Sequence, residues 1–150
     1  MFKSILVVCV GNICRSPMAE ALLKMHAPAD VHIHSAGIGA LVGNPADAHA
    51  LQLMQERSID ISAHRARQLT PAMAAAADLI LVMEAGHQRR IHAISPASRG
   101  KVHMLGKWAD MDVPDPYQKS PEYFAYTLGL IEQGVDQWAA KLWGKSRTED

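Results

Sequence analysis

The sequence is poor in cysteine, in net charge and in long apolar runs, and each shortage excludes a class of protein. Two cysteines among 150 residues cannot form the disulfide framework of a small secreted domain, so a reducing compartment is expected. A formal net charge of zero argues against broad electrostatic attraction to nucleic acid or to an anionic membrane. No apolar run approaches the roughly 18 residues of a membrane span. We therefore expect a cytoplasmic protein without membrane insertion and without a nucleic-acid partner.

The N-terminus could be mistaken for a signal peptide, because Lys3 precedes an apolar run over residues 5–10. That run is very short, however, and no small-residue cleavage site follows it. A chain of 150 residues, of which 49% are hydrophobic, is long enough for one domain with its own core. We predict a single domain over residues 1–150, with a frayed polar tail from about residue 144.

The most informative stretch is residues 4–17. A run of β-branched residues favours a buried strand that ends at Cys9, and a Gly-Asn pair favours a turn after it. Pro17 suits a first helical turn, where a missing N–H has no partner to lose. The stretch therefore predicts a strand, a loop and a helix, with a thiol at the strand end and the guanidinium of Arg15 at the helix start.

That arrangement suits an anion. A loop that enters a helix N-terminus directs several backbone N–H groups into one concavity, and the helix dipole makes the concavity positive. Arg15 adds a planar fork that can grip two phosphate oxygens at once. The same positive field favours the thiolate form of Cys9. A thiolate that faces a bound phosphoryl group is a nucleophile facing its electrophile.

The order Cys9, five residues, Arg15, Ser16 resembles the Cys-x5-Arg-Ser/Thr signature of protein tyrosine phosphatases. The full string Cys-Val-Gly-Asn-Ile-Cys-Arg-Ser-Pro, placed near the N-terminus, resembles the low-molecular-weight family. The resemblance implies a phosphoric monoester hydrolase that acts on protein phosphotyrosine through a cysteinyl-phosphate intermediate, without a cofactor or metal. Cys9 would be the nucleophile, and Arg15 would bind the phosphate. The loop amides that would share this binding belong to Val10, Gly11, Asn12, Ile13 and Cys14.

The rest of the chain alternates between helical and strand patterns. Helices are predicted around Met18, Ala21, Leu22 and Met25, over residues 46–57, from Pro71 through an alanine-rich run, over 84–94, and along a stripe from Phe124 to Leu142. Strands are predicted over residues 5–8, 31–35, 78–83 and 102–105, with an irregular crossing over 59–68 and a polar loop over 106–120. Such alternation argues for an α/β fold with a parallel sheet.

Four strands with helices on both faces fit a three-layer, flavodoxin-like fold with the sheet order 2-1-3-4. The family resemblance implies the same fold. Such folds bind ligands at the carboxyl ends of the strands, where the strand order switches beside the first strand. Cys9 would lie at that end, so the expected topology and the motif agree.

The reaction also needs a proton donor for the leaving phenolate. Asp115-Pro116-Tyr117 matches the Asp-Pro-Tyr/Phe element that carries the general acid in the resembled family, which makes Asp115 the expected acid and later the base for water. Proline holds the residue before it in an extended geometry. Asp110 and Asp112 are rivals, but neither precedes a proline. The alternative role of the Asp-Pro pair is turn formation alone.

Further polar residues are expected to support the loop. Ser16 can donate a hydrogen bond to the thiolate, or it caps the helix. Asn12 has a side chain that can tie the loop to its surroundings, and the resemblance implies Ser35 and His64 as its partners. The alternative for His64 is an ordinary surface histidine.

Substrate selection is expected in the pocket walls, where Ile13, Leu41 and Tyr117 could flank a phenyl ring. The loop Gly-Ala-Leu-Val-Gly at residues 39–43 resembles bacterial members of the family that are paired with exopolysaccharide tyrosine kinases. The resemblance implies that the partner is an autophosphorylated kinase of that kind. Gln118 stands where the family usually has a second aromatic residue.

Cys14 is either a buried small residue or, as the resemblance favours, a partner that captures oxidised Cys9 in a reversible disulfide. An arsenate reductase of the same fold would need further cysteines, and none follows Cys14. A cysteine phosphocarrier needs neither Arg15 nor Asp115, and the presence of both also argues against a silent phosphotyrosine-binding module. Two thiolates alone make an incomplete structural zinc site.

Overall fold

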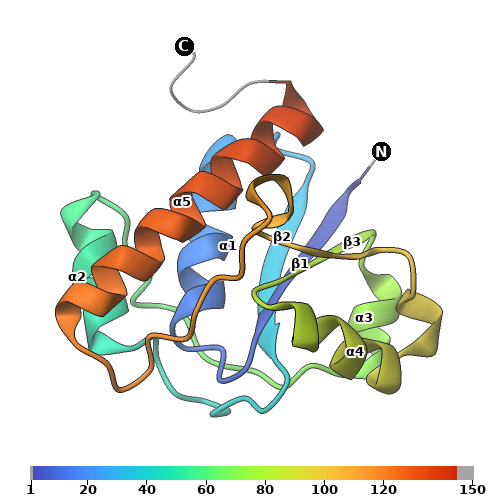
Figure 1. Cartoon of the computed structure of the whole chain (residues 1–150), viewed down its shortest axis with the longest axis horizontal. Helices are drawn as coiled ribbons and strands as arrows, with labels where there is room; N and C mark the ends of the chain where they lie inside the picture. The colour runs from blue at the N-terminus through green and yellow to red at the C-terminus, as the bar shows by residue number, and fades with distance from the viewer. Residues whose placement is uncertain (1, 145–150) are drawn as a thin grey trace.

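Parallel strands in the order β2-β1-β3-β4 form the centre of the structure, a computed structural model that describes residues 2–144. This order confirms the predicted α/β topology. The strands are β1 (Ser4–Cys9), β2 (His32–Gly37), β3 (Leu79–Val82) and β4 (Val102–Met104). The helices are α1 (Arg15–His26), α2 (Ala48–Glu56), α3 (Pro71–Ala76), α4 (Ala85–Ile94) and α5 (Pro121–Trp143) (Figure 1).

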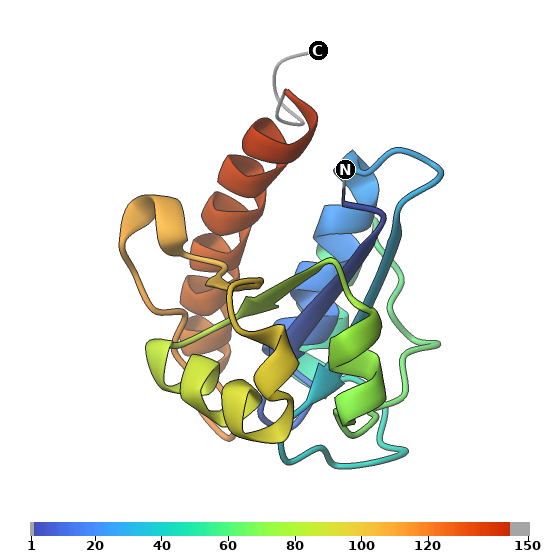
Figure 2. The ribbon, with the colours of Figure 1, turned by 90° about the vertical axis from the view of Figure 1, so that its right-hand side faces the viewer.

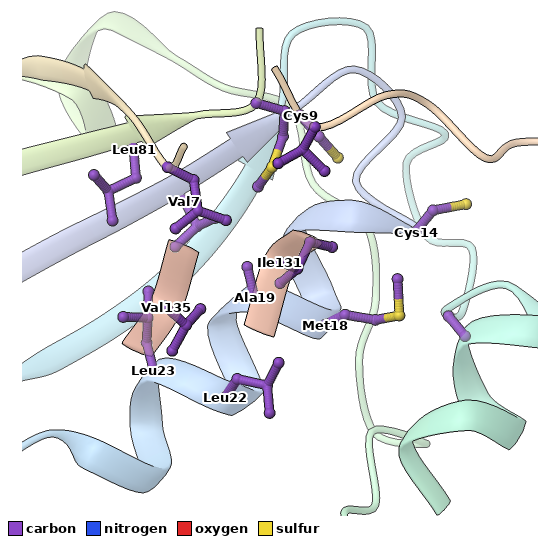
Figure 3. Close-up of a cluster of buried hydrophobic side chains, with 14 of the residues drawn as sticks. Val7, Cys9, Cys14, Met18, Ala19, Leu22, Leu23, Leu81, Ile131 and Val135 are labelled. Atoms are coloured by element: carbon purple, nitrogen blue, oxygen red, sulfur yellow. The ribbon is translucent and has the colours of Figure 1, made fainter. Parts of the chain in front are cut away.

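Helices cover both faces of the sheet, with α1, α2 and α5 on one side and α3 and α4 on the other (Figures 1 and 2). Strand β1 is buried on both sides because helices cover both faces of the sheet, and its successive side chains point to opposite faces. Ile5 and Val7 belong to the core shared with α1 and α5, whereas Leu6 and Val8 belong to the core under α3 and α4. Figure 3 shows part of the first core. The unbroken apolar run thus fixes Cys9 at the carboxyl edge of the sheet.

The long helix α5 buries the predicted stripe. Phe124, Leu128 and Ile131 are fully buried, and Trp138 is nearly so. The helix starts sharply because the Ser120 hydroxyl accepts a hydrogen bond from the Tyr123 N–H at 3.1 Å. The expected amphipathic helix is therefore confirmed, and it holds the segment that follows β4 against the sheet.

The first helix buries Met18 and Leu22 as predicted, but its buried stripe does not extend to Met25. Met25 is 43% exposed, whereas Ala19 and Leu23 are fully buried. Because the buried stripe is centred on Ala19 and Leu23, Met25 lies at its margin in the last turn. The expectation that Met25 packs on the sheet is wrong.

Helix α2 begins at Ala48, later than predicted, because Asp47 serves as its N-cap. The Asp47 carboxylate accepts a hydrogen bond from the His49 N–H at 2.9 Å, which satisfies one of the donors that a helix N-terminus leaves free.

The loops largely follow the sequence. The expected irregular crossing over residues 59–68 is confirmed, except that Gln68 forms an isolated bridge with Gly37. The polar loop over residues 106–120 contains a short 3-10 turn, Lys107–Ala109, that the sequence did not indicate.

The predicted frayed tail falls mainly on residues 145–150, which lie outside the described residues. Among the helices that the structure describes, none is both long enough and apolar enough to cross a bilayer.

Two glycines of α5 provide a matched test of how this helix packs. A methyl group on Gly134 would lie 2.8 Å from the Leu105 main-chain oxygen, whereas a methyl group on Gly129 would meet nothing within 4 Å. We expect Gly134→Ala to lower the free energy of unfolding by about 1–3 kcal/mol through overpacking. Gly129→Ala should raise it by about 0.5–1 kcal/mol through helix propensity. Urea unfolding measures both changes, and equal stability of the two variants would contradict the close packing of α5 on Leu105.

Candidate active site

The loop between β1 and α1 presents its oxygens outward. The carbonyls of Cys9, Val10, Gly11 and Ile13 accept hydrogen bonds at 2.8–3.1 Å from backbone N–H groups of residues 38–47. None of the N–H groups of residues 10–14 makes a hydrogen bond to another described residue. Unsatisfied N–H groups at the start of a helix form an anion-binding site. The loop can therefore hold an oxyanion with its backbone alone.

This loop depends on one unusual backbone conformation and on one close contact with β2. Asn12 has a φ of 61°, in the left-handed region that Asn tolerates better than most residues. At Gly37 any side chain would clash, because an added Cβ would lie 2.4 Å from the Val10 oxygen. The close approach of Gly37 holds the loop against the end of β2.

The loop forms the floor of a pocket at the carboxyl edge of the sheet. Cys9, Arg15 and Asp115, the residues predicted to carry the chemistry, all line it. They come from the end of β1, the start of α1 and the loop before α5. The structure therefore brings these three residues to one pocket, although Cys9 and Asp115 lie more than a hundred positions apart in the sequence.

Arg15 is buried, with 1% of its side chain exposed. Its Nη1 donates hydrogen bonds to Glu84 Oε2 at 2.5 Å and to the Val113 main-chain oxygen at 2.8 Å. Its Nη2 lies 3.6 Å from Asp115 Oδ2. No hydrogen bond joins Nε or Nη2 to a described residue, so this edge of the guanidinium is left for a bidentate oxyanion.

Sequence reasoning missed Glu84 and Val113. Glu84 lies two residues after the end of β3, so the parallel topology brings its side chain to the same edge as Cys9. An acidic residue at the end of a buried strand was the signal that could have revealed it. The Val113 oxygen carried no signal, since any residue supplies a main-chain carbonyl.

The Cys9 sulfur contacts a network of polar side chains. Cys9 Sγ lies 2.9 Å from Ser16 Oγ. Asn12 Nδ2 donates to Ser16 Oγ at 2.7 Å and to Ser35 Oγ at 3.0 Å. Ser35 Oγ in turn donates to Glu20 Oε1 at 2.6 Å. Three of these residues were expected at the loop, whereas Glu20 was not.

The donor and acceptor of each hydrogen bond in this network follow from the groups at its two ends, the Arg67 N–H and the Glu20 carboxylate. The Arg67 N–H donates to Asn12 Oδ1 at 2.9 Å, so the amide nitrogen of Asn12 must face the two serines. Each serine therefore accepts from Asn12 and keeps its own proton to donate. The Ser35 proton goes to the carboxylate of Glu20, and the Ser16 proton is left for the sulfur of Cys9. The Cys9 sulfur therefore receives a hydrogen bond from the Ser16 hydroxyl.

His64 lies beside the loop but contacts it differently from the expectation. Its Nε2 is 2.6 Å from the main-chain oxygen of Asn12, not from the Asn12 side chain. A carbonyl only accepts, so Nε2 carries the proton. His64 thus holds the residue whose backbone is left-handed.

Cys14 is a buried free thiol, as is Cys9. Burial, followed by the nearby carboxylate of Asp47, raises the pKa of the Cys14 thiol well above its ordinary value. Its side chain points away from Cys9 at the end of the strand (Figure 3). Cys14 is therefore held as a neutral thiol. Unlike Cys9, it has no hydroxyl donor among the described residues.

Asp115 is the one of the three neighbouring aspartates that lines the pocket. Its Oδ1 accepts from the Tyr117 N–H at 3.0 Å, and the side chain remains 45% exposed. Asp112 instead accepts from the Ala85 N–H at 3.1 Å and so caps α4. Asp110 is exposed and has a left-handed backbone. A half-exposed carboxylate beside the pocket can exchange protons with a bound ester and with water.

The walls of the pocket are apolar. Ile13 is nearly buried, while Leu41 and Tyr117 are 38% and 41% exposed and form the rim. Such a cleft, with a polar floor and apolar walls, accommodates a flat ring that carries an oxyanion. The three predicted wall residues are thus brought together.

A thiol, a buried guanidinium and free backbone N–H groups around one pocket are the parts that a cysteine-dependent phosphoryl hydrolase requires. Residues 4–148 match the family described as low molecular weight phosphotyrosine protein phosphatase. The chain belongs to this family, and it is a protein tyrosine phosphatase.

Named relatives agree with this assignment. The probable low molecular weight protein-tyrosine-phosphatase EpsP of Ralstonia nicotianae is 49% identical over 142 residues, 95% of this chain and 97% of the relative. The crystal structure of the tyrosine phosphatase Wzb from Escherichia coli K30 in complex with sulphate superimposes with a TM-score of 0.91 at 45% identity, covering 95% of this chain and 99% of that one. The YwlE arginine phosphatase from Geobacillus stearothermophilus is less similar, with a TM-score of 0.87 at 34% identity over 93% of this chain and 92% of that one.

Proposed function

We propose that Cys9 is the nucleophile, that Arg15 and the loop amides bind the phosphate, and that Asp115 is the general acid and then the base. The observation that carries this proposal is the convergence of all three side chains on one pocket whose loop N–H groups have no other described partner. Because a phosphoryl transition state spreads charge over its equatorial oxygens, such donors stabilise it directly.

In the first step the Cys9 thiolate attacks phosphorus, and the bond from phosphorus to the tyrosine oxygen breaks. Asp115 gives its proton to the leaving phenolate. In the second step a water molecule attacks the cysteinyl phosphate while the Asp115 carboxylate takes a proton from it. The sulfur leaves as a thiolate that Ser16 stabilises, since the Ser16 hydroxyl lies 2.9 Å away. Cys14 remains, as a proposal, the residue that could trap oxidised Cys9.

The proposed substrate is a phosphotyrosine protein in the cytoplasm, an autophosphorylated bacterial tyrosine kinase that controls exopolysaccharide. The apolar walls Ile13, Leu41 and Tyr117 support an aromatic ester. The similarity to EpsP and Wzb phosphatases supports a bacterial substrate of this kind. Phosphoarginine, the substrate class that the name of YwlE indicates, is less favoured. Ile13 and Leu41 offer a guanidinium no acceptor.

Replacement of the nucleophile is the most direct test. Cys9→Ser should abolish turnover of p-nitrophenyl phosphate, because a serine hydroxyl in this loop is a far weaker nucleophile than a thiolate. Cys14→Ala is the matched control and should keep most of the activity. Steady-state kinetics measures both. Turnover that survives Cys9→Ser would identify another nucleophile.

Replacement of the acid should depend on the leaving group. Asp115→Asn should lower kcat by roughly 10²–10⁴-fold for aryl phosphates with poor leaving groups. The loss should be smaller for p-nitrophenyl phosphate, because its leaving group needs less protonation. Asp110→Asn, in the same loop but outside the pocket, serves as the control. An equal loss on every leaving group would assign Asp115 a structural role.

A comparison of phosphopeptides tests the substrate class. In the presence of a chelator, kcat/KM for phosphotyrosine peptides should exceed that for phosphoserine and phosphoarginine peptides by roughly 10²-fold. The reason is that only the aromatic ester fills the walls while its phosphate reaches the loop. An autophosphorylated exopolysaccharide-type kinase should be turned over at least as well as the peptides. A preference for phosphoarginine would overturn the proposed substrate.

A further inference from the structure

His87 is a buried imidazole that the reaction as described does not use. It lies in the first turn of α4, and 7% of its side chain is exposed. Its Nδ1 is buried and has no hydrogen-bond partner among the described residues. Its Nε2 lies 3.7 Å from Glu84 Oε2. Buried polar groups are normally paired, so an orphaned ring nitrogen requires an explanation.

The Glu84 oxygen beside His87 is the one that holds the guanidinium. Glu84 Oε2 accepts from Arg15 Nη1 at 2.5 Å, so one carboxylate oxygen lies between a guanidinium and an imidazole. Helices α1 and α4 cover opposite faces of the sheet (Figure 2). At its carboxyl edge Arg15, the first residue of α1, reaches Glu84, the residue before α4.

Glu84 is free for this contact because another residue caps α4. Glu84 occupies the N-cap position, but its side chain makes no capping hydrogen bond. Asp112 accepts from the Ala85 N–H in its place. The Glu84 carboxylate can therefore turn toward either neighbour.

The charge of His87 depends on several groups around it. Burial is the main reason that the pKa of His87 is below its ordinary value, and the positive charges of Arg15 and Arg90 lower it further. Glu84 and Asp112 act in the opposite direction. The imidazole is thus neutral near neutral pH and becomes a cation only in acid.

We propose that His87 is a positioning residue for Arg15, acting through the Oε2 atom of Glu84. A neutral imidazole leaves that oxygen to the guanidinium. A protonated imidazole draws the same oxygen toward α4, loosens Arg15 and weakens oxyanion binding in the pocket. The inference rests on the proposed role of Arg15 in binding phosphate.

Sulfate is the probe for this inference, because its charge does not change across the range in which histidine titrates, about pH 5 to pH 8. The inhibition constant of sulfate against p-nitrophenyl phosphate hydrolysis is measured over this range for the wild type and for His87→Gln. The wild type should lose affinity toward acid by roughly fivefold more than the variant, the lower end of ordinary coupling between two sites. His92→Gln, on the same helix, is the control and should retain the wild-type profile.

A double-mutant cycle separates this route from a direct field of the imidazolium on the anion. If His87 acts through Glu84, then His87→Gln should have no effect on sulfate affinity in a Glu84→Gln background. An effect that persists there would overturn the proposal. So would identical pH profiles for the wild type and His87→Gln.

A measurement on the wild type covers the case in which a variant does not fold. Because coupling is reciprocal, sulfate should make His87 harder to protonate, and its NMR titration midpoint should fall as sulfate is added. A midpoint that rises or stays constant would refute the inference. Loss of sulfate inhibition at every pH would instead refute the proposed role of the pocket, so the two failures are distinguishable.

Discussion

The pocket depends on a buried guanidinium that is held on one side and free on the other. Arg15 commits Nη1 to Glu84 and to the Val113 oxygen, and it keeps Nε and Nη2 for a ligand. Three segments that are distant in sequence must converge for this to happen: the start of α1, the end of β3 and the loop before α5. A buried charge without partners would strongly destabilise the fold. The ion pair with Glu84 therefore links the stability of the sheet edge to the shape of the pocket.

The sequence indicated those parts of the site that depend on residues close together in the chain. The strand, loop and helix around Cys9 follow from residue types a few positions apart. Asp115 was indicated by the resemblance of Asp115-Pro116-Tyr117 to the general-acid element of the family. Residues whose role depends on a tertiary contact could not be identified from the sequence. Glu84 and Glu20 look like ordinary helix-end and helix-surface acids until the fold brings Arg15 and Ser35 to them. The misplaced Met25 has the same origin, since the centre of the buried stripe is set by the neighbours of α1.

The Cys9 thiol and the Arg15 guanidinium are both held by hydrogen-bond networks, but the two networks are built from different groups. The Cys9 side is built from hydroxyl and amide groups whose directions are fixed from the Arg67 N–H at one end and the Glu20 carboxylate at the other. The Arg15 side is built from carboxylates and a carbonyl around a permanent cation. The first orients a proton toward sulfur, whereas the second orients a charge toward the ligand.

This difference determines which histidine can change the geometry of the pocket when it is protonated. His64 donates from Nε2 to the Asn12 oxygen, and Nε2 carries a proton in this tautomer and in the imidazolium alike, so the hydrogen bond survives protonation. His87 instead faces a carboxylate oxygen already shared with Arg15, where a new positive charge competes for the same acceptor. Two histidines flank one pocket, and because their acceptors differ, only the one beside Glu84 can convert a proton into a movement of the guanidinium.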